Sequence, residues 1–116
     1  MFNQQIMKII YNNIIPFRGF VAINLFGLLF IRKEYKGKID SRTLNHESIH
    51  TAQMRELLYL GFYLAYVIEW CIRLFMRGNA YRNISFEREA YSNESDVEYL
   101  KERKHFAFVS YLRQVK

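Results

Sequence analysis

Short apolar segments separated by polar residues and glycine make up the first third of the chain. Residues 6–15 are apolar on average without a clear period, so the pattern leaves their conformation open. Residues 19–24 and 28–33 have the length of strands and are rich in Val, Ile and Phe, and only three residues separate them. This pattern predicts two strands of a hairpin, in which Gly27 supplies the unusual backbone dihedral of the turn.

A helical pattern begins after a polar connection. Asp40 or Ser41 offers an N-cap, and the helix that follows is predicted to run to about Leu58. A second, strongly apolar helix continues through Met76 and ends before Gly78, which we expect to adopt the left-handed conformation that terminates many helices. The middle of the chain is therefore predicted to contain two consecutive helices.

A third helix is predicted after Ser85, which can act as its N-cap. The residues of its apolar stripe are Phe86, Ala90, Val97 and Leu100. Residues 106–112 form a last short aromatic element. This order of elements predicts an α+β fold, with a small β-hairpin or sheet packed on the helices, as one domain over residues 1–116.

The apolar segment 57–76, LLYLGFYLAYVIEWCIRLFM, is long enough to cross a bilayer. Its ten Leu, Ile, Val and Phe residues contribute about −0.5 kcal/mol each to insertion, roughly −5 kcal/mol in all, whereas two central charges cost roughly +5 to +7 kcal/mol. These charges, Glu69 and Arg73, stand four residues apart and can pair on a helix. We favour a buried core helix, with embedding in or attachment to a membrane as the alternative.

Composition narrows the class of protein. Hydrophobic residues make up 51% of the 116 residues and aromatic residues 17%, which predicts a packed core and excludes a disordered chain. The single cysteine, Cys71, excludes an internal disulfide and a cysteine-rich zinc finger, and we expect it to be a buried thiol in a reducing compartment. The predicted location is therefore cytoplasmic, with membrane association through residues 57–76 as the alternative.

The net charge of +6, from 17 Lys and Arg against 11 Asp and Glu, raises the question of a nucleic-acid partner. The one dense basic stretch, residues 32–42, is interrupted by Glu34 and Asp40. Because a mixed run of this kind is typical of a solvated loop, we expect no nucleic-acid partner. A membrane surface stays open as a partner.

The candidate chemistry is concentrated in residues 46–50, HESIH, which form the motif H-E-x-x-H. Residues i and i+4 lie one turn apart on the same helix face, so the imidazoles of His46 and His50 can reach one ion at about 2.0–2.1 Å. Glu47 is offset from that face and can contact the water bound to the ion, where it would act as a general base. The motif therefore predicts a catalytic metal site on the first helix.

A catalytic zinc site needs a third protein ligand and an open position for water. His105 is the only other histidine in the chain, so a carboxylate at the start of the third helix is the remaining candidate. Glu87 and Glu89 both lie there, but on a helix they point about 200° away from each other. Only one of them can face the two histidines, and the other is expected to be a solvated acid of the first helical turn.

H-E-x-x-H followed by E-x-x-A on a later helix, residues 87–90 here, resembles the gluzincin class of zinc metallopeptidases, in particular the single-domain minigluzincins. The resemblance covers roughly residues 20–94. It implies a zincin-like fold, in which the strand pair lies beside the active-site helix and binds extended substrate, and it implies Glu47 as the catalytic base. The implied Zn²⁺ ligands are His46, His50 and Glu87, with Glu89 as the alternative third ligand.

Further residues are candidates for the surroundings of this site, as supports of the metal ligands or as substrate contacts. Glu94 lies seven residues after Glu87 and shares its helix face, so it can orient a histidine; an exposed acid paired with a nearby Arg is the alternative. Gln53 lies on the face of the two histidines, where it can contact substrate or form part of the cleft wall. No motif identifies an oxyanion-stabilising group, and Tyr81 and Tyr91 are the candidates.

The predicted function is hydrolysis of peptide bonds in a peptide or protein substrate, by a zinc-activated water with Glu47 as general base. The alternative is a noncatalytic zinc-binding or membrane-associated interaction module that keeps the metal triad as a structural clip. The two hypotheses differ in one testable respect, since only the first requires the Glu47 carboxylate.

Overall fold

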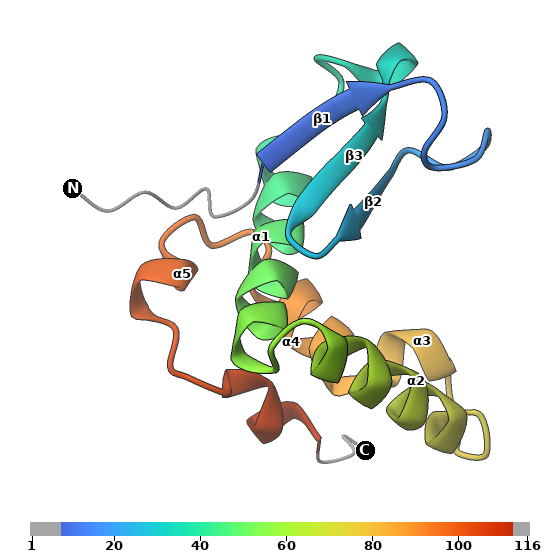
Figure 1. Cartoon of the computed structure of the whole chain (residues 1–116). Helices are drawn as coiled ribbons and strands as arrows, with labels where there is room; N and C mark the ends of the chain where they lie inside the picture. The colour runs from blue at the N-terminus through green and yellow to red at the C-terminus, as the bar shows by residue number, and fades with distance from the viewer. Residues whose placement is uncertain (1–7, 113–116) are drawn as a thin grey trace.

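A small sheet forms one side of the fold. In the computed structural model, which describes residues 8–112, the sheet has three strands in the order β1-β3-β2 (Figure 1). β2 (Ala22–Leu25) and β3 (Leu28–Arg32) pair in antiparallel orientation, so the predicted hairpin is confirmed. β1 (Lys8–Asn12), whose conformation the pattern left open, pairs in parallel orientation with β3.

The turn between β2 and β3 is built from two residues with positive φ. Phe26 has φ 55° and Gly27 has φ 87°, the pair of left-handed conformations that a two-residue hairpin favours, so the prediction for Gly27 is confirmed. The buried side chain of Asn24 closes this turn, because its Oδ1 accepts a hydrogen bond from the Gly27 N–H at 3.1 Å. Its Nδ2 donates to Thr51 Oγ1 at 3.0 Å, which fastens the hairpin to the first helix.

Helix α1 (Ser41–Glu56) packs against the sheet through Leu44 in its first turn as well as through Thr51. Of the two candidate caps, Asp40 is the one used, because its side chain accepts a hydrogen bond from the Thr43 N–H at 2.9 Å. The partly buried Leu44 packs against the two fully buried side chains of β3. The helix ends two residues before the predicted Leu58.

Helix α2 (Leu60–Arg73) has one face in the core and one face exposed. The buried residues of the core cluster that its inner face joins are Met54, Phe62, Ile84, Phe86 and Phe108. Its outer face is apolar and exposed, so the expected burial of this helix holds for one face only, and Cys71 is exposed instead of buried. Among residues 8–112, no helix combines the length and the apolar character that crossing a membrane requires.

The apolar helix ends earlier than predicted. The backbone N–H groups of Phe75 and Met76 bond to carbonyls three residues back, so the chain tightens into turns and α2 stops at Arg73. Gly78, with φ 89°, lies in the connection that follows and not at the end of the helix. The chain then reverses into the short helix α3 (Ala80–Asn83), which the pattern did not predict.

Helix α4 (Ser85–Asn93) lies beside α1 and carries the two candidate acids. The prediction that Ser85 caps this helix is wrong. The N-cap position is Ile84, and the Ser85 hydroxyl donates to Glu69 Oε1 of α2 at 2.7 Å. Because α4 ends at Asn93, Val97 lies beyond the helix and is exposed, so it does not belong to an apolar stripe of α4 as predicted.

Two short helices complete the described chain: α5 (Tyr99–Glu102) and a 3-10 helix (Ala107–Tyr111), which corresponds to the predicted aromatic element. Phe108 of the 3-10 helix packs on the core cluster against α4. Residues 8–112 therefore form an α+β fold with a three-stranded sheet and five α-helices, and the sheet lies at one end of α1 (Figure 1).

Candidate metal site

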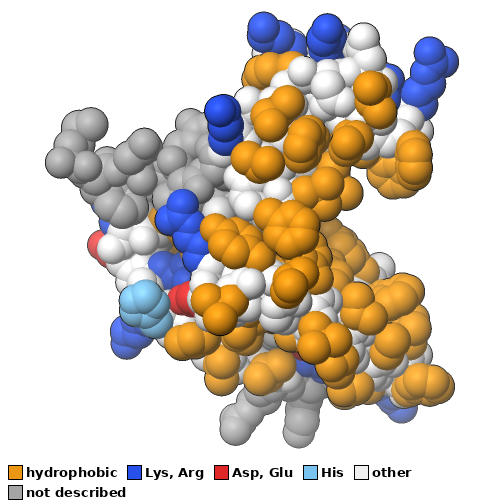
Figure 2. Space-filling model, in the orientation of Figure 1, with side chains coloured by type: hydrophobic (Ala, Val, Ile, Leu, Met, Phe, Trp, Pro, Cys, Tyr) orange, Lys and Arg blue, Asp and Glu red, His pale blue; other side chains and the backbone are white. Residues whose placement is uncertain are grey.

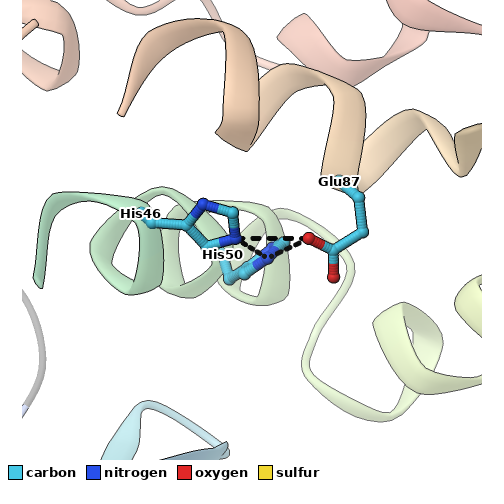
Figure 3. Close-up of side chains that lie close together, drawn as sticks. All are labelled: His46, His50 and Glu87. Atoms are coloured by element: carbon cyan, nitrogen blue, oxygen red, sulfur yellow. Dashed lines mark hydrogen bonds and ion pairs between the residues drawn. The ribbon is translucent and has the colours of Figure 1, made fainter. Parts of the chain in front are cut away.

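Three buried side chains converge where α1 faces α4. His46 and His50 lie one turn apart on α1, and Glu87 extends from the first turn of α4 toward both (Figure 3). Glu87 Oε1 is 3.2 Å from His46 Nε2 and 3.1 Å from His50 Nε2, and the two Nε2 atoms are 3.2 Å apart. All three residues offer ligand atoms within 4.8 Å of one another, so the group could hold a metal ion.

The spacing and the chemistry of these donors fit a divalent transition metal. Ligand atoms about 2.1 Å from one tetrahedral ion lie roughly 3.4 Å from one another. The observed separations of 3.1–3.2 Å are close to that value. Imidazole nitrogen and carboxylate oxygen are also donor types that such ions accept. The cluster therefore has the number, type and spacing of donors that a metal ion requires from a protein.

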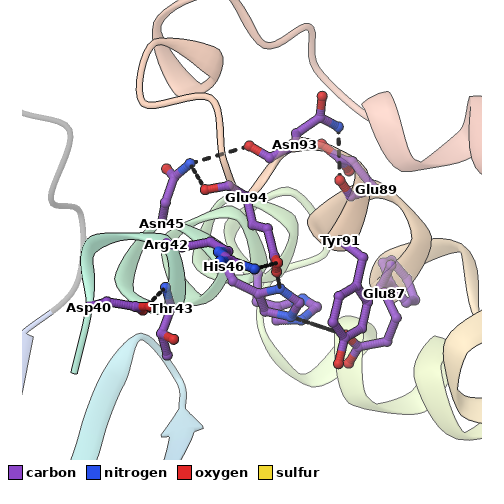
Figure 4. Close-up of polar contacts among 12 residues, drawn as sticks. Asp40, Arg42, Thr43, Asn45, His46, Glu87, Glu89, Tyr91, Asn93 and Glu94 are labelled. Atoms are coloured by element: carbon purple, nitrogen blue, oxygen red, sulfur yellow. Dashed lines mark hydrogen bonds and ion pairs between the residues drawn. The ribbon is translucent and has the colours of Figure 1, made fainter. Parts of the chain in front are cut away.

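Residues near the end of α4 hold the ring of His46. Glu94 Oε1 is 2.7 Å from His46 Nδ1, and Arg42 lies 3.6 Å from the other oxygen of that carboxylate (Figure 4). A proton on Nδ1 serves this contact and leaves Nε2 with a lone pair that faces the cluster. Tyr91 packs edge-on against the ring, with the centroids 4.6 Å apart. Glu94 thus combines parts of both alternatives, because it contacts a histidine and also pairs with Arg42, although it is partly buried and not exposed.

Gln53 has the equivalent position behind His50. Its Oε1 lies 2.8 Å from His50 Nδ1, and its Nε2 donates to Phe86 O at 3.0 Å and to Glu89 Oε1 at 2.9 Å. The side chain is fully buried, so it does not form part of the cleft wall, and of the two predicted roles, support of a metal ligand or contact with substrate, its position agrees with the first. Gln53 therefore supports a candidate ligand and connects α1 to α4.

Glu89 points away from the histidines into a second polar cluster. It is fully buried, accepts a hydrogen bond from the Tyr99 hydroxyl at 2.6 Å, and pairs with the guanidinium of Arg103. Arg103 also donates to both oxygens of Glu56, at 2.9 and 3.0 Å. The structure therefore places Glu89 outside the metal cluster, and the expectation of a solvated acid is wrong, because a buried arginine balances its charge.

Tyr66 of α2 contacts the cluster without having been predicted to do so. Its hydroxyl donates to Glu87 Oε2 at 2.7 Å. Burial, reinforced by the charge of Glu87, raises the pKa of Tyr66, so the hydroxyl stays protonated and acts as a donor. One turn further on, Glu69 accepts a hydrogen bond from the Ser85 N–H at 2.8 Å. Helix α2 therefore positions the first turn of α4 and the carboxylate that it carries.

The charges of the cluster depend on one another. Burial alone disfavours a charge on His50, but the adjacent Glu87 carboxylate raises the pKa of His50 to about 9. Burial also disfavours the charge on Glu87, yet His50 and His46 hold the pKa of that carboxyl well below its usual range. In the absence of metal, a proton on the imidazole supplies the positive charge that the carboxylate requires. Metal binding must displace this proton.

Within the part of the chain that the structure describes, two cavities border the cluster. One, of about 350 Å³, lies between β2 and α2, and its lining combines the three residues of the cluster with apolar and aromatic side chains such as Met54 and Phe62. The other, of about 390 Å³, is bordered by the start of α1 and by α4. Glu47 and Tyr81 line both cavities, so both side chains can meet a molecule bound beside the cluster.

His105, the third histidine, is exposed and lies 3.5 Å from Glu56, away from the metal cluster.

No family model, curated protein or solved structure matches the chain. The functional argument therefore depends on the geometry and chemistry of the site itself.

Proposed function

We propose that the chain is a zinc-dependent metallopeptidase of the gluzincin class, with a zincin-like fold. The observation that carries this proposal is the convergence of three buried ligand atoms beside a cavity that Glu47 also lines. The histidines come from the H-E-x-x-H motif and the third donor, Glu87, comes from E-x-x-A, as the resemblance implies. The hairpin fastened to α1 by Asn24 gives further support, since a strand pair beside the active-site helix is part of the same resemblance.

The donor set favours zinc. Two imidazoles and one carboxylate form the protein part of many catalytic zinc sites, which keep a further position for water. Magnesium and calcium prefer oxygen ligands, and copper(I) and iron–sulfur centres prefer thiolates, whereas Cys71, the only cysteine, is exposed on α2. The same donors also suit non-haem iron, which metal analysis distinguishes from zinc. Bound zinc would lower the pKa of a water molecule toward neutrality and polarise the scissile carbonyl.

Glu47 is placed to transfer a proton. It follows His46 directly on α1, so its carboxylate is offset from the face of the ligands and borders both cavities. It would take a proton from the attacking water and return it to the leaving amine. Burial raises the pKa of Tyr81, which keeps its hydroxyl protonated, and the Tyr91 hydroxyl lies 3.2 Å away. We infer that Tyr81 donates to the carbonyl oxygen as negative charge develops there.

The sheet edge supports a peptide as the substrate. β2 is an edge strand of the described sheet, and its residues line the cavity beside the cluster. An extended peptide can add to such an edge through main-chain hydrogen bonds. The neighbouring cavity wall includes Leu25, Met54 and Phe62. We therefore expect a preference for peptides with large apolar side chains near the bond that is cleaved.

Glu47→Gln separates an enzyme from a noncatalytic zinc module. Wild-type protein purified without a histidine tag should contain about one zinc ion per chain and cleave members of a broad peptide library. The variant should retain zinc, because Glu47 lies outside the ligand cluster, and should lose roughly 10²–10⁴ in turnover. Glu102→Gln, which changes an exposed acid on α5, is the matched control and should alter neither property.

The outcomes distinguish the alternatives. Zinc without turnover in the wild type would favour the noncatalytic module that retains the metal triad. Turnover that Glu47→Gln leaves unchanged would remove that residue from the mechanism. Protein that contains no zinc, and whose melting temperature does not rise when zinc is added, would refute the metal site itself.

A further inference from the structure

The outward face of α2 is an exposed apolar surface. Its members recur at intervals of three and four residues, which places them on one side of the helix: Leu60, Leu64, Val67, Ile68 and Ile72. Their exposed fractions run from 51% at Ile68 to 72% at Leu60. The polar contacts that α2 makes to α4, through Tyr66 and Glu69, come from the opposite side. One face of this helix therefore contacts the residues of the metal cluster, and the other is apolar and exposed.

A second apolar surface lies on the connection between β1 and β2. Ile14 is 77% exposed, Phe17 81% and Phe20 62%. This connection and α2 lie on the same side of the molecule (Figure 1), and Figure 2 shows apolar side chains over both, with a hollow between them. The cavity beside the metal cluster also lies between β2 and α2, but α2 borders it with Phe62, Tyr63 and Tyr66 and not with its outward face.

Charged residues are segregated around these two surfaces. The exposed charged residues of segments 8–33 and 57–82 are all cationic: Lys8, Arg18, Lys33, Arg77 and Arg82. The exposed acids of the described chain lie in other segments: Glu34, Asp40, Asp96, Glu98 and Glu102. Figure 2 accordingly shows no acidic atoms in the right-hand half of the view, where the apolar side chains gather. Glu34 is the exposed acid that borders this side: it lines a cavity with Ile14, Phe17 and Arg18, and its carboxylate pairs with Arg32 at 2.8 Å. An anionic surface approaching this side would therefore meet the cations together with a carboxylate whose charge Arg32 balances, and would be attracted.

We propose that these two apolar surfaces dock the protein on an anionic lipid bilayer, with α2 lying in the plane of the membrane interface. The 14 residues of α2 extend about 21 Å, less than the roughly 30 Å of the hydrocarbon core, whereas an amphipathic helix of this length can lie flat in the interface. Trp70, beside the exposed face, is 42% exposed and belongs to a residue type that favours membrane interfaces. A fluid bilayer can contact both surfaces across the hollow that separates them.

Vesicle flotation with the full chain tests this docking. Vesicles of phosphatidylcholine with about 30% phosphatidylglycerol should bind the protein roughly tenfold or more tightly than phosphatidylcholine alone, and the difference should shrink as salt rises from about 0.1 M to about 0.5 M. The double variant Leu64→Ser/Val67→Ser should weaken binding roughly tenfold or more, and so should Phe17→Ser/Phe20→Ser.

Val97→Ser provides the matched control. Val97 is 53% exposed, almost the same fraction as the 54% of Val67, but lies on the chain between α4 and α5, outside both surfaces. This variant should change vesicle binding by less than about twofold. Each substitution replaces an exposed side chain, and an unchanged melting temperature verifies that the variants fold.

Absence of vesicle binding by the wild type, or equal losses in Val97→Ser and Leu64→Ser/Val67→Ser, would overturn the proposal. A dimer that forms without vesicles and that the double variant dissociates would assign the α2 surface to a second copy of the chain and would also overturn it. Flotation requires no turnover, so the Glu47→Gln protein should bind vesicles as the wild type does. Failure of the proposed hydrolysis is therefore distinguishable from failure of membrane docking.

Discussion

The Tyr66→Phe substitution removes one hydroxyl group from the candidate metal site and keeps the aromatic ring. The hydroxyl donates to Glu87 Oε2 at 2.7 Å, and the ring packs against Phe62 and Phe86 in the core. Because the ring contacts stay in place, this change isolates the hydrogen bond that holds the Glu87 carboxylate. It therefore asks whether α2 takes part in positioning a metal ligand.

The expected loss of zinc affinity follows from the type of hydrogen bond that the substitution removes. A hydrogen bond to a charged acceptor contributes about 1.5–3 kcal/mol. Since about 1.4 kcal/mol corresponds to a factor of ten in an equilibrium constant, its loss predicts roughly 10- to 100-fold weaker zinc binding. Removing a hydrogen-bond partner of a metal ligand typically weakens metal binding by a factor in the same range.

Competition with a chelator of known affinity, at fixed pH, measures the effect. Tyr63→Phe is the matched control, because Tyr63 lies on the same helix and its hydroxyl contacts the backbone of Asn24 and Phe26 instead of Glu87. We expect the loss of zinc affinity in Tyr66→Phe and none beyond about twofold in the control. Equal zinc affinities in the two variants would refute the reasoning that Tyr66 positions a ligand.

Other residues predict effects of different kinds. Glu89→Gln removes the charge that pairs with the buried Arg103 and should lower the free energy of unfolding by about 3 kcal/mol, as measured in denaturant, while the zinc content stays unchanged; loss of zinc would contradict the placement of Glu89 outside the cluster. In the metal-free protein, the pKa of His50 is raised from 6.5 to about 9, so its contribution to stability, up to about 3 kcal/mol, is complete below about pH 6.5 and is lost as the pH rises to about 9. The zinc-loaded protein should instead gain stability as the pH rises over this range, because protons compete with the metal for the ligands. Thermal melts measure both pH dependences, and melting temperatures that change in the same direction with and without a chelator would contradict this prediction. Gly27→Ala places a side chain at φ 87° and should lower the free energy of unfolding, measured in urea, by about 1–2 kcal/mol. A loss of free energy smaller than that caused by an alanine substitution at an exposed helical site would show that the turn is not strained.

Local signals predicted the features that neighbours along the chain determine. Asp40 caps α1 because its side chain reaches a backbone N–H only three residues away. Gly27 forms the turn because the two strands beside it leave room for a two-residue connection alone. His46 and His50 share a face of α1 because helical geometry requires it. Each of these outcomes depends on a few consecutive residues, and a sequence pattern contains that information.

Contacts between distant segments could not be predicted in this way. Glu89 is buried because Arg103, 14 residues later, folds over α4, and Arg103 is held there by Glu56, which lies 47 residues before it. Tyr66 reaches Glu87 across 21 residues, and its helical spacing among other aromatic residues indicates only that it packs in the core. No turn sequence predicts the parallel pairing of β1 with β3, because parallel strands are not joined by a tight turn. These features depend on how elements pack, which periodicity does not specify.

A metal ion held between α1 and α4 would also act as a cross-link of the chain. His50 and Glu87 are 37 residues apart, so the ion would close a loop that contains all of α2 and α3. For a covalent cross-link around a loop of this length, the entropy removed from the unfolded chain corresponds to about 4 kcal/mol at 25 °C. With a single cysteine, the chain cannot form an internal disulfide that would close the same loop. Chelation should therefore release α2 and α3 to local unfolding first, and added protease should cut within residues 57–84 faster once the metal is removed.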